Sequence, residues 1–172
     1  MKKIPLTQNK EALVDDDDFE RMAQYSWSAI YHKGNRSWYA ARNIWLCGDK
    51  FKKQYMARLI VNAKPHEEVD HANHDTLDNQ KENLRVCTRT QNAQNRKKRR
   101  FGRVGTWSKF KGVMKKGNLW VVRICYNGKR HFVGGYKDET DAAMSYDNEA
   151  RKHFGKFAHC NFPIVSSQMG GV

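Results

Sequence analysis

One stretch near the middle of the 172-residue chain constrains the fold more than any other. Two short β-prone segments, 69–71 and 84–87, are separated by a polar, turn-rich loop. Thr88 then begins a helix, because Gln91 follows three residues later and completes a capping box. The predicted order is strand, long loop, strand and helix.

Three polar residues of this stretch are candidates for chemistry. Asp70 and His71 are adjacent in a strand, so their side chains point to opposite faces unless the strand end twists. Asn92, early in the following helix, can reach back over the hairpin. A carboxylate and an amide oxygen make a hard-oxygen site that suits Mg²⁺, and an imidazole beside it can deprotonate water. The alternative is structural: most Asp-His pairs serve the fold, and Asn92 could be a helix-surface residue.

The sequence of residues 69–92, VDHANHDTLDNQKENLRVCTRTQN, resembles the HNH endonuclease motif of phage and intron homing enzymes. The likeness lies in the Asp-His pair, a D-x-x-D-N loop, E-N-L-R, and T-x-x-x-N at this spacing. The last position is Asn92 instead of His, a variant found within that family.

The resemblance implies a ββα-metal site in which Asp70 and Asn92 bind one divalent cation, Mg²⁺ or Mn²⁺, with no zinc. His71 would be the general base, and Asn83 would hold the loop and orient His71 by hydrogen bonds. A base must be neutral, so activity should fall at acidic pH. The metal would stabilise the phosphate and the leaving 3′-oxygen.

Two further residues are supporting candidates. His74 lies in the loop, where it could support the metal shell, contact phosphate or serve loop packing. Asn95 sits one turn beyond Asn92 and could face DNA or solvent. In many similar sequences the helix before the motif carries a His where this chain has Ala57.

Charge is distributed unevenly along the chain. Residues 1–92 hold 15 Lys and Arg against 13 Asp and Glu, whereas residues 93–172 hold 17 against 5, within a net charge of +14. This balance favours a polyanionic partner, and a basic bridge from residue 96 to residue 116 is predicted to follow the DNA backbone. The alternative is a solubilising or nuclear-targeting stretch. The bridge contains Arg96, Lys97, Lys98, Arg99, Arg100, Arg103, Lys109, Lys111, Lys115 and Lys116.

The C-terminal third predicts a small sheet and a helix. β-Prone stretches at 112–114, 119–126 and 130–136 are separated by turn residues, including Asn127-Gly128, a strong hairpin signal. A helix should follow, capped by Asp138 and closed by Gly155. Its alanines would let it sit close against the three-stranded sheet.

This region resembles the AP2 DNA-binding domain through Lys111-Gly112-Val113, 120–124, Phe132-Val133-Gly134, Ala142-Ala143, Tyr146-Asp147, Ala150 and Asn161-Phe162-Pro163. That domain lays its sheet in the DNA major groove. The resemblance places seven residues on or near the DNA face: Lys111, Met114, Lys116, Trp120, Arg123, Arg130 and Phe132. Arginines there could contact guanine edges bidentately, and lysines the backbone. Trp120 and Phe132 could instead be core residues.

The N-terminal segment predicts a helix from the acidic run 15–18, with Phe19, Met22, Ala23 and Trp27 on one face. Helix capping is the favoured role of the acids, and metal binding is the alternative. Strands are expected at 38–46 and 51–55, and a short helix at 56–61. Four scattered cysteines without a C-x-x-C pair indicate free thiols, and no apolar run reaches membrane-spanning length.

The predicted fold class is α+β: an HNH nuclease domain at 1–100 with its motif core at 67–99, a basic linker at 101–106, an AP2-like domain at 107–163 and a tail at 164–172. The expected protein is a site-specific endonuclease of double-stranded DNA, a nicking homing endonuclease that hydrolyses a phosphodiester bond with one metal ion and a His general base. The alternative is a non-catalytic DNA-binding regulator with a decayed motif. A monomer is favoured and a dimer stays open. A cytoplasmic location is expected, with a bacteriophage gene acting in a bacterial host.

Overall fold

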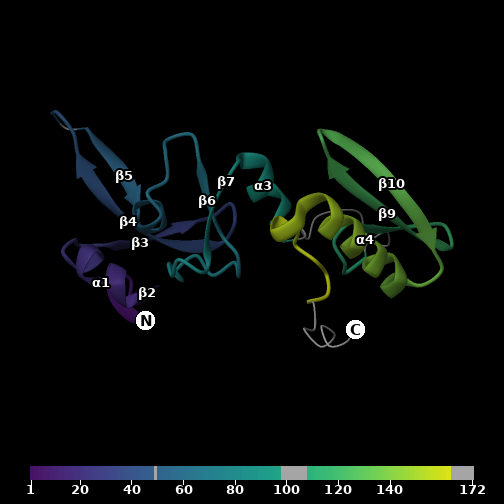
Figure 1. Cartoon of the computed structure of the whole chain (residues 1–172), viewed down its shortest axis with the longest axis horizontal. Coiled ribbons are helices and arrows are strands. Elements are labelled where there is room, and N and C mark those ends of the chain that lie inside the picture. Colours follow the sequence, from purple (N-terminus) through teal and green to yellow (C-terminus); the bar gives the residue numbers. More distant parts are fainter. Residues whose placement is uncertain (49, 98–107, 164–172) are drawn as a thin grey trace, which may run out of the picture. The chain divides into compact units, whose positions relative to one another are not determined.

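The computed structural model describes residues 1–48, 50–97 and 108–163 (Figure 1). The chain divides into two compact units, Met1–Asn92 and Ala93–Val172. The expected linker at 101–106, the tail at 164–172 and four candidate DNA-binding residues, Lys98, Arg99, Arg100 and Arg103, lie outside the described residues.

Small antiparallel sheets and short helices make up the first unit. Its elements are β1 (Lys2–Leu6), β2 (Lys10–Val14), α1 (Asp16–Ala23), β3 (Ser28–His32), β4 (Ser37–Trp45), β5 (Phe51–Tyr55), α2 (Met56–Ile60), β6 (Glu68–His71), β7 (Leu84–Cys87) and the start of α3 (Arg89–Gln94). Strand β1 pairs with β2, β4 lies between β3 and β5, and β6 pairs with β7. These sheets confirm the α+β class.

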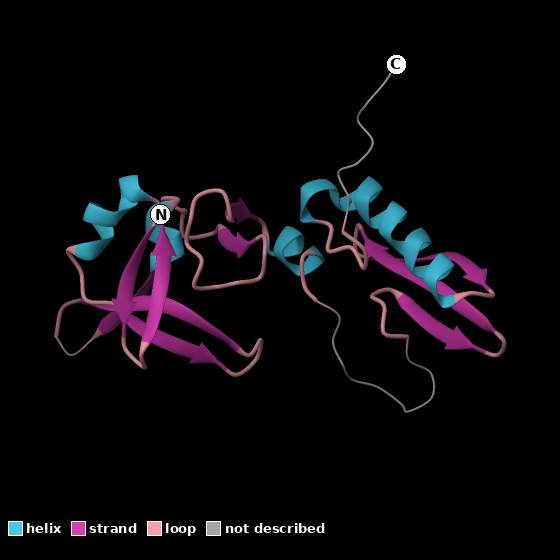
Figure 2. Cartoon of the chain, turned by 90° about the horizontal axis from the view of Figure 1, so that it is seen from below, coloured by secondary structure: helices cyan, strands magenta, loops and turns pink. Residues whose placement is uncertain are grey.

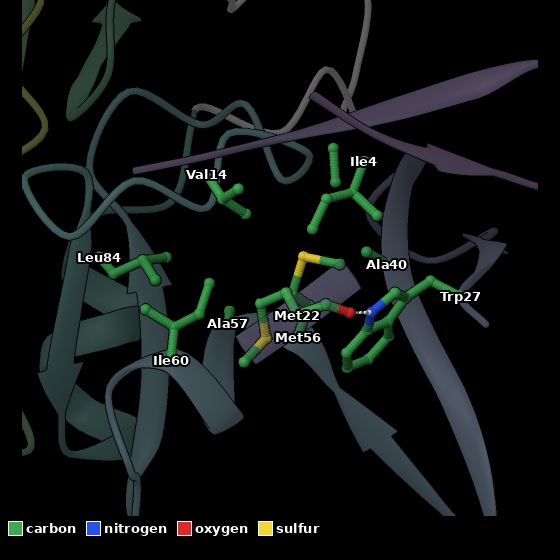
Figure 3. Close-up of a cluster of buried hydrophobic side chains, with 10 residues drawn as sticks. Ile4, Val14, Met22, Trp27, Ala40, Met56, Ala57, Ile60 and Leu84 are labelled. Atoms are coloured by element: carbon green, nitrogen blue, oxygen red, sulfur yellow. Dashed lines mark hydrogen bonds between the residues drawn. The ribbon is translucent and has the colours of Figure 1, made fainter. Parts of the chain in front are cut away.

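Apolar side chains from α1, α2, β1, β2, β4 and β7 converge on one core (Figure 3). Met22 and Met56 are fully buried, and each such side chain contributes about 1.5–3 kcal/mol by leaving water. Trp27 is also buried, and its indole Nε1 donates to the carbonyl oxygen of Met22 at 2.8 Å. The core therefore leaves this aromatic donor paired. Ala57 is part of the same cluster.

Several predicted elements of this unit are confirmed, and others were missed by sequence patterns. Strands β4 and β5 and helix α2 lie where expected. Strands β1, β2 and β3 are not predicted. The β1–β2 turn is formed by Gln8 and Asn9, both at positive φ (61° and 52°), without the glycine that usually signals such a hairpin.

The acidic run at the start of α1 does more than face the helix dipole. Asp15 makes no side-chain cap bond, and its carboxylate instead accepts from the backbone nitrogen of Lys81 at 2.8 Å. Asp18 is buried and pairs with Lys81 at 2.8 Å and Arg21 at 2.6 Å. Burial alone would raise the pKa of Asp18, but these two cations hold it below its ordinary value. The run thus ties α1 to the long loop between β6 and β7.

The second unit is a three-stranded antiparallel sheet with one helix along a single face (Figure 2). Its elements are β8 (Val113–Lys116), β9 (Leu119–Tyr126), β10 (Lys129–Tyr136), α4 (Glu139–Phe154) and a 3₁₀ turn (Gly155–Phe157). The Asp138 carboxylate accepts from the backbone nitrogens of Thr140 and Asp141, which confirms the predicted cap. Gly155 ends α4 at a φ of 51°.

Gly112 is required where the chain enters β8. Its φ is +77°, and a Cβ atom there would lie 1.9 Å from Cδ2 of the Tyr146 ring. Tyr146 is itself buried among the alanines of α4. The Tyr146 ring on α4 and the backbone before β8 can approach this closely only because residue 112 has no side chain.

A buried carboxylate on α4 fixes the segment that follows the helix. Asp147 is 1% exposed and accepts from the backbone nitrogens of Asn161 at 2.7 Å and Phe162 at 2.8 Å, and from Asn161 Nδ2 at 3.0 Å. The Asn161 amide in turn bonds both backbone groups of Lys111. One acid therefore links α4, the C-terminal segment and the entry to the sheet.

Candidate functional site

The β6–β7 hairpin sorts the candidate residues onto two faces. Asp70 lies opposite Arg85, and Glu68 lies opposite Cys87. Directly opposed residues of an antiparallel pair share a face, and successive residues alternate. Glu68 and Asp70 therefore share one face, whereas His71 points to the other, as strand alternation predicts.

Asp70 is held by a cross-strand ion pair. Its Oδ2 accepts from Nη2 of Arg85, and both side chains are largely buried. The carboxylates on this face also affect Cys87. Burial raises the pKa of the Cys87 thiol to about 11, and the charges of Asp70 and Glu68 act in the same direction. Cys87 is therefore a neutral thiol beside two acids.

Asn92 lies over the same face as Asp70. The predicted capping box is confirmed: Gln91 N donates to Thr88 Oγ1, and Thr88 N donates to Gln91 Oε1. The helix begins there, and Asn92 Nδ2 donates to Oε2 of Glu68 at 2.6 Å. This bond brings an amide from α3 to the face of β6 that carries Asp70.

His71 is buried, and its ring lies edge-on to that of Tyr39 with the centroids 6.2 Å apart. Its Nε2 lies 3.5 Å from Oδ1 of Asn79. Burial lowers the pKa of His71, while the Asn79 bond and the nearby Asp70 charge oppose that shift. The imidazole is thus favoured in its neutral form.

The Asn79 contact selects one tautomer of the neutral ring. Asn79 is 1% exposed, and its Nδ2 donates to the carbonyl oxygen of Leu77 at 3.0 Å, which turns Oδ1 toward His71. An amide oxygen only accepts, so the tautomer that fits this contact carries its proton on Nε2. Nδ1 then carries the lone pair that accepts a proton.

Asn83 closes the long loop from inside. Its Oδ1 accepts from the backbone nitrogen of Asn73 at 2.9 Å, and its Nδ2 donates to the carbonyl oxygen of Asp78 at 2.7 Å. This geometry fits the loop-holding role expected from the sequence. Asn79, another asparagine of this loop, contacts His71 at Nε2.

The supporting candidates occupy different surroundings. His74 is half-buried at a φ of 65°, and its backbone nitrogen donates to the carbonyl oxygen of His71. Asn95 is only 4% exposed, so it does not face solvent as one of its expected orientations required. It belongs to the second unit, separately from the hairpin.

Strand alternation divides the candidate nucleic-acid face of the second unit. Val122 and Ile124 face α4, so Arg123 lies on the outer face of the sheet. Phe132 is opposite Arg123 and 67% exposed, which places it outside the core. Lys116, Met114 and Arg130 are also exposed and fall on the outer face by register.

Two candidates for the nucleic-acid face lie elsewhere. Trp120 packs against the core on the α4 side, the alternative that the sequence left open. Lys111 turns inward: its Nζ donates to the carbonyl oxygen of Gln94 at 2.6 Å, and burial lowers its pKa to about 8. Lys109 is exposed, as are Arg96 and Lys97 of the basic bridge.

Glu68, Asn79 and Arg85 are the site residues that sequence reasoning missed. Asn79 sits in the D-x-x-D-N stretch, and Arg85 in E-N-L-R, so both lie inside the quoted motif. Glu68 stands two residues before Asp70, and period-two alternation is the signal that would have found it.

Residues 64–94 match the family model described as HNH endonuclease. The chain is also similar to an uncharacterized HNH endonuclease of Acanthamoeba polyphaga mimivirus, with 28% identity over 153 residues, covering 87% of this chain and 74% of the relative. Both findings indicate a nuclease. Among the helices that the structure describes, none has the length and apolar character needed to cross a membrane.

Proposed function

We propose that the protein is a divalent-metal-dependent HNH endonuclease that hydrolyses one phosphodiester bond in double-stranded DNA. The observation that carries this proposal is the Glu68–Asn92 bond, which brings the Asn92 amide over the hairpin face of Asp70. The buried, neutral His71 is adjacent to Asp70 in the same strand. The proposed proton acceptor and the two proposed oxygen donors therefore come from adjacent residues of β6 and from the helix that follows β7.

The donor chemistry fits a small divalent cation. Asp70 supplies a carboxylate and Asn92 an amide oxygen, and such sparse oxygen sites leave positions for water and phosphate. Among residues 1–48, 50–97 and 108–163, no group of three or more His, Cys, Asp or Glu side chains is placed to hold a metal ion. The proposed site therefore depends on the amide as well as the carboxylate.

The hydrogen bonding of His71 defines the proposed path of the proton. His71 accepts the proton of the attacking water at Nδ1, because Nε2 already carries one toward Asn79. The water oxygen forms the new bond to phosphorus, the bond to the 3′-oxygen breaks, and solvent returns a proton to that oxygen. When bound, the cation supplies Lewis-acid stabilisation of the phosphate and the leaving oxygen.

Supercoiled plasmid tests metal dependence and strand count together. With Mg²⁺ or Mn²⁺ we expect nicked circles, because one chain offers one such site, and in EDTA we expect no conversion. Restoring excess Mg²⁺ should restore nicking. Cleavage in EDTA would contradict the metal site, and linear product from a single binding event of a monomer would contradict nicking. Binding without cleavage in Mg²⁺ would favour the regulator alternative.

The second unit is proposed to hold DNA on the outer face of its sheet, where Lys116, Arg123 and Arg130 are grouped. Neutralising about six phosphates predicts that affinity falls roughly 10³-fold between about 50 and 200 mM salt. Anisotropy of a mixed-sequence duplex measures this slope. Lys116→Ala should reduce the slope of log affinity against log salt concentration by about 1, the change expected for the loss of one phosphate contact. Lys152→Ala, an exposed lysine of α4, is the matched control and should leave the slope unchanged; equal slopes for both variants would refute this face.

We further propose the finer features expected from the sequence: an AP2-like unit that selects the site, a homing role, and a phage gene acting in bacterial cytoplasm. The three-stranded sheet packed on one helix supports the AP2-like assignment. Selecting bound sequences from a random duplex library tests it, since a reader of base edges should enrich a defined site.

A further inference from the structure

Glu68 is an acid at the site with no role in the proton path. Its side chain shares the hairpin face of Asp70, and its Oε2 accepts from Asn92 Nδ2 at 2.6 Å. A hydrogen bond of this kind, between an amide and an ionised carboxylate, is stronger than a neutral one. It joins β6 to a helix of only six residues.

This bond fixes which end of the Asn92 amide faces the hairpin. The two ends are similar in size, but only the nitrogen donates. The flipped amide would place its oxygen against the Glu68 carboxylate, where two acceptors repel. The Asn92 oxygen therefore points away from Glu68. The backbone of Asn92 is held separately, since its nitrogen donates to the carbonyl oxygen of Thr88 at 3.0 Å.

We propose that Glu68 is a positioning residue for Asn92: it holds the amide nitrogen so that the oxygen is presented to the divalent cation. This inference rests on the proposed function. Glu68 acts here through its acceptor oxygen, not as a ligand. Partners that orient metal ligands typically contribute 10- to 100-fold in metal affinity.

Two substitutions separate the acceptor from the charge. Glu68→Gln removes the charge but keeps an acceptor oxygen, whereas Glu68→Ala removes both. Glu67, the next residue along, bonds the backbone nitrogen of Lys64 instead of Asn92. Glu67→Gln and Glu67→Ala therefore make the same charge changes one position away and serve as matched controls.

The first measurement is Mn²⁺ binding to the full-length protein without DNA, by electron paramagnetic resonance. Glu68→Ala should weaken binding by about 10-fold or more, and Glu68→Gln by roughly threefold or less. The two Glu67 variants should bind like the wild type. Equal binding by Glu68→Ala and wild type would overturn the proposal. An equal loss in both Glu68 variants would also overturn it, because charge or direct ligation would then be the cause.

The second measurement needs no metal. The side-chain amide resonances of Asn92, assigned with Asn92→Ala, should shift in Glu68→Ala and stay near wild type in Glu68→Gln. Unchanged resonances in both variants would overturn the proposal, whatever their thermal stability. Failure of the proposed function looks different: wild type would bind no Mn²⁺, or Asp70→Ala would bind it equally well. Loss restricted to Glu68→Ala supports the positioning role.

Discussion

Replacing His71 with alanine is expected to lower the rate of plasmid nicking by about 10²- to 10⁴-fold, the range typical for loss of a general base. The structure gives the reason: the ring is buried, favoured as neutral, and bonded at Nε2 so that Nδ1 can accept a proton. Alanine retains none of these properties. Rates should be measured at saturating Mg²⁺, with thermal unfolding checked for each variant.

His66→Ala is the matched control for this experiment, because His66 is an exposed histidine of the same unit. It should cleave at a rate close to that of the wild type. The wild-type pH profile is a companion measurement. Protonated imidazole cannot accept a proton, so cleavage should fall as the pH drops through the lowered pKa of His71. A His71→Ala rate within about threefold of wild type would remove His71 from the mechanism.

Replacing Asp147 with alanine should cost about 3 kcal/mol or more of the stability of the second unit. Three donors from Asn161 and Phe162 lose their acceptor, and the segment after α4 loses its attachment to the helix. Hydrogen exchange resolves the effect by region. Amides of β8–β10 and α4 should lose protection, while those of β3–β5 should keep it, since they belong to the other unit.

Asp141→Ala provides the comparison for Asp147. Asp141 is an exposed acid in the first turn of the same helix, so its removal should cost about 0.3–1 kcal/mol through the helix dipole. If both variants lose protection equally, the buried network does not carry the stability assigned to it.

Turn and capping residues in the sequence predicted the elements whose ends they set. Asn127-Gly128, Asp138 and Gly155 delimit β9, β10 and α4, and Thr88 with Gln91 starts α3, all within a residue or two of the observed ends. Strands β1 and β2 escaped because their turn uses Gln8 and Asn9, whose positive φ has no strong sequence signal.

Only the motif residues of the site could be predicted from the sequence. The resemblance to the HNH motif predicted Asp70, His71, Asn83 and Asn92, but the partners of their side chains depend on register and loop path. Asn79 orients His71 because the loop folds back upon the strand, a tertiary contact that spacing does not encode. Similarly, Trp120 and Phe132 differ in exposure because they lie on opposite faces of one sheet.

The hydrogen bonds and the ion pair between the long loop and the N-terminal elements show how much of the chain is needed to shape the loop. Leu13 exchanges backbone bonds with Leu77 and Asn79, while Asp15 and Asp18 hold Lys81. The segment that matches the family model begins only at residue 64. The matched stretch is therefore not self-sufficient: taken alone, it would lack the partners that give its loop a shape.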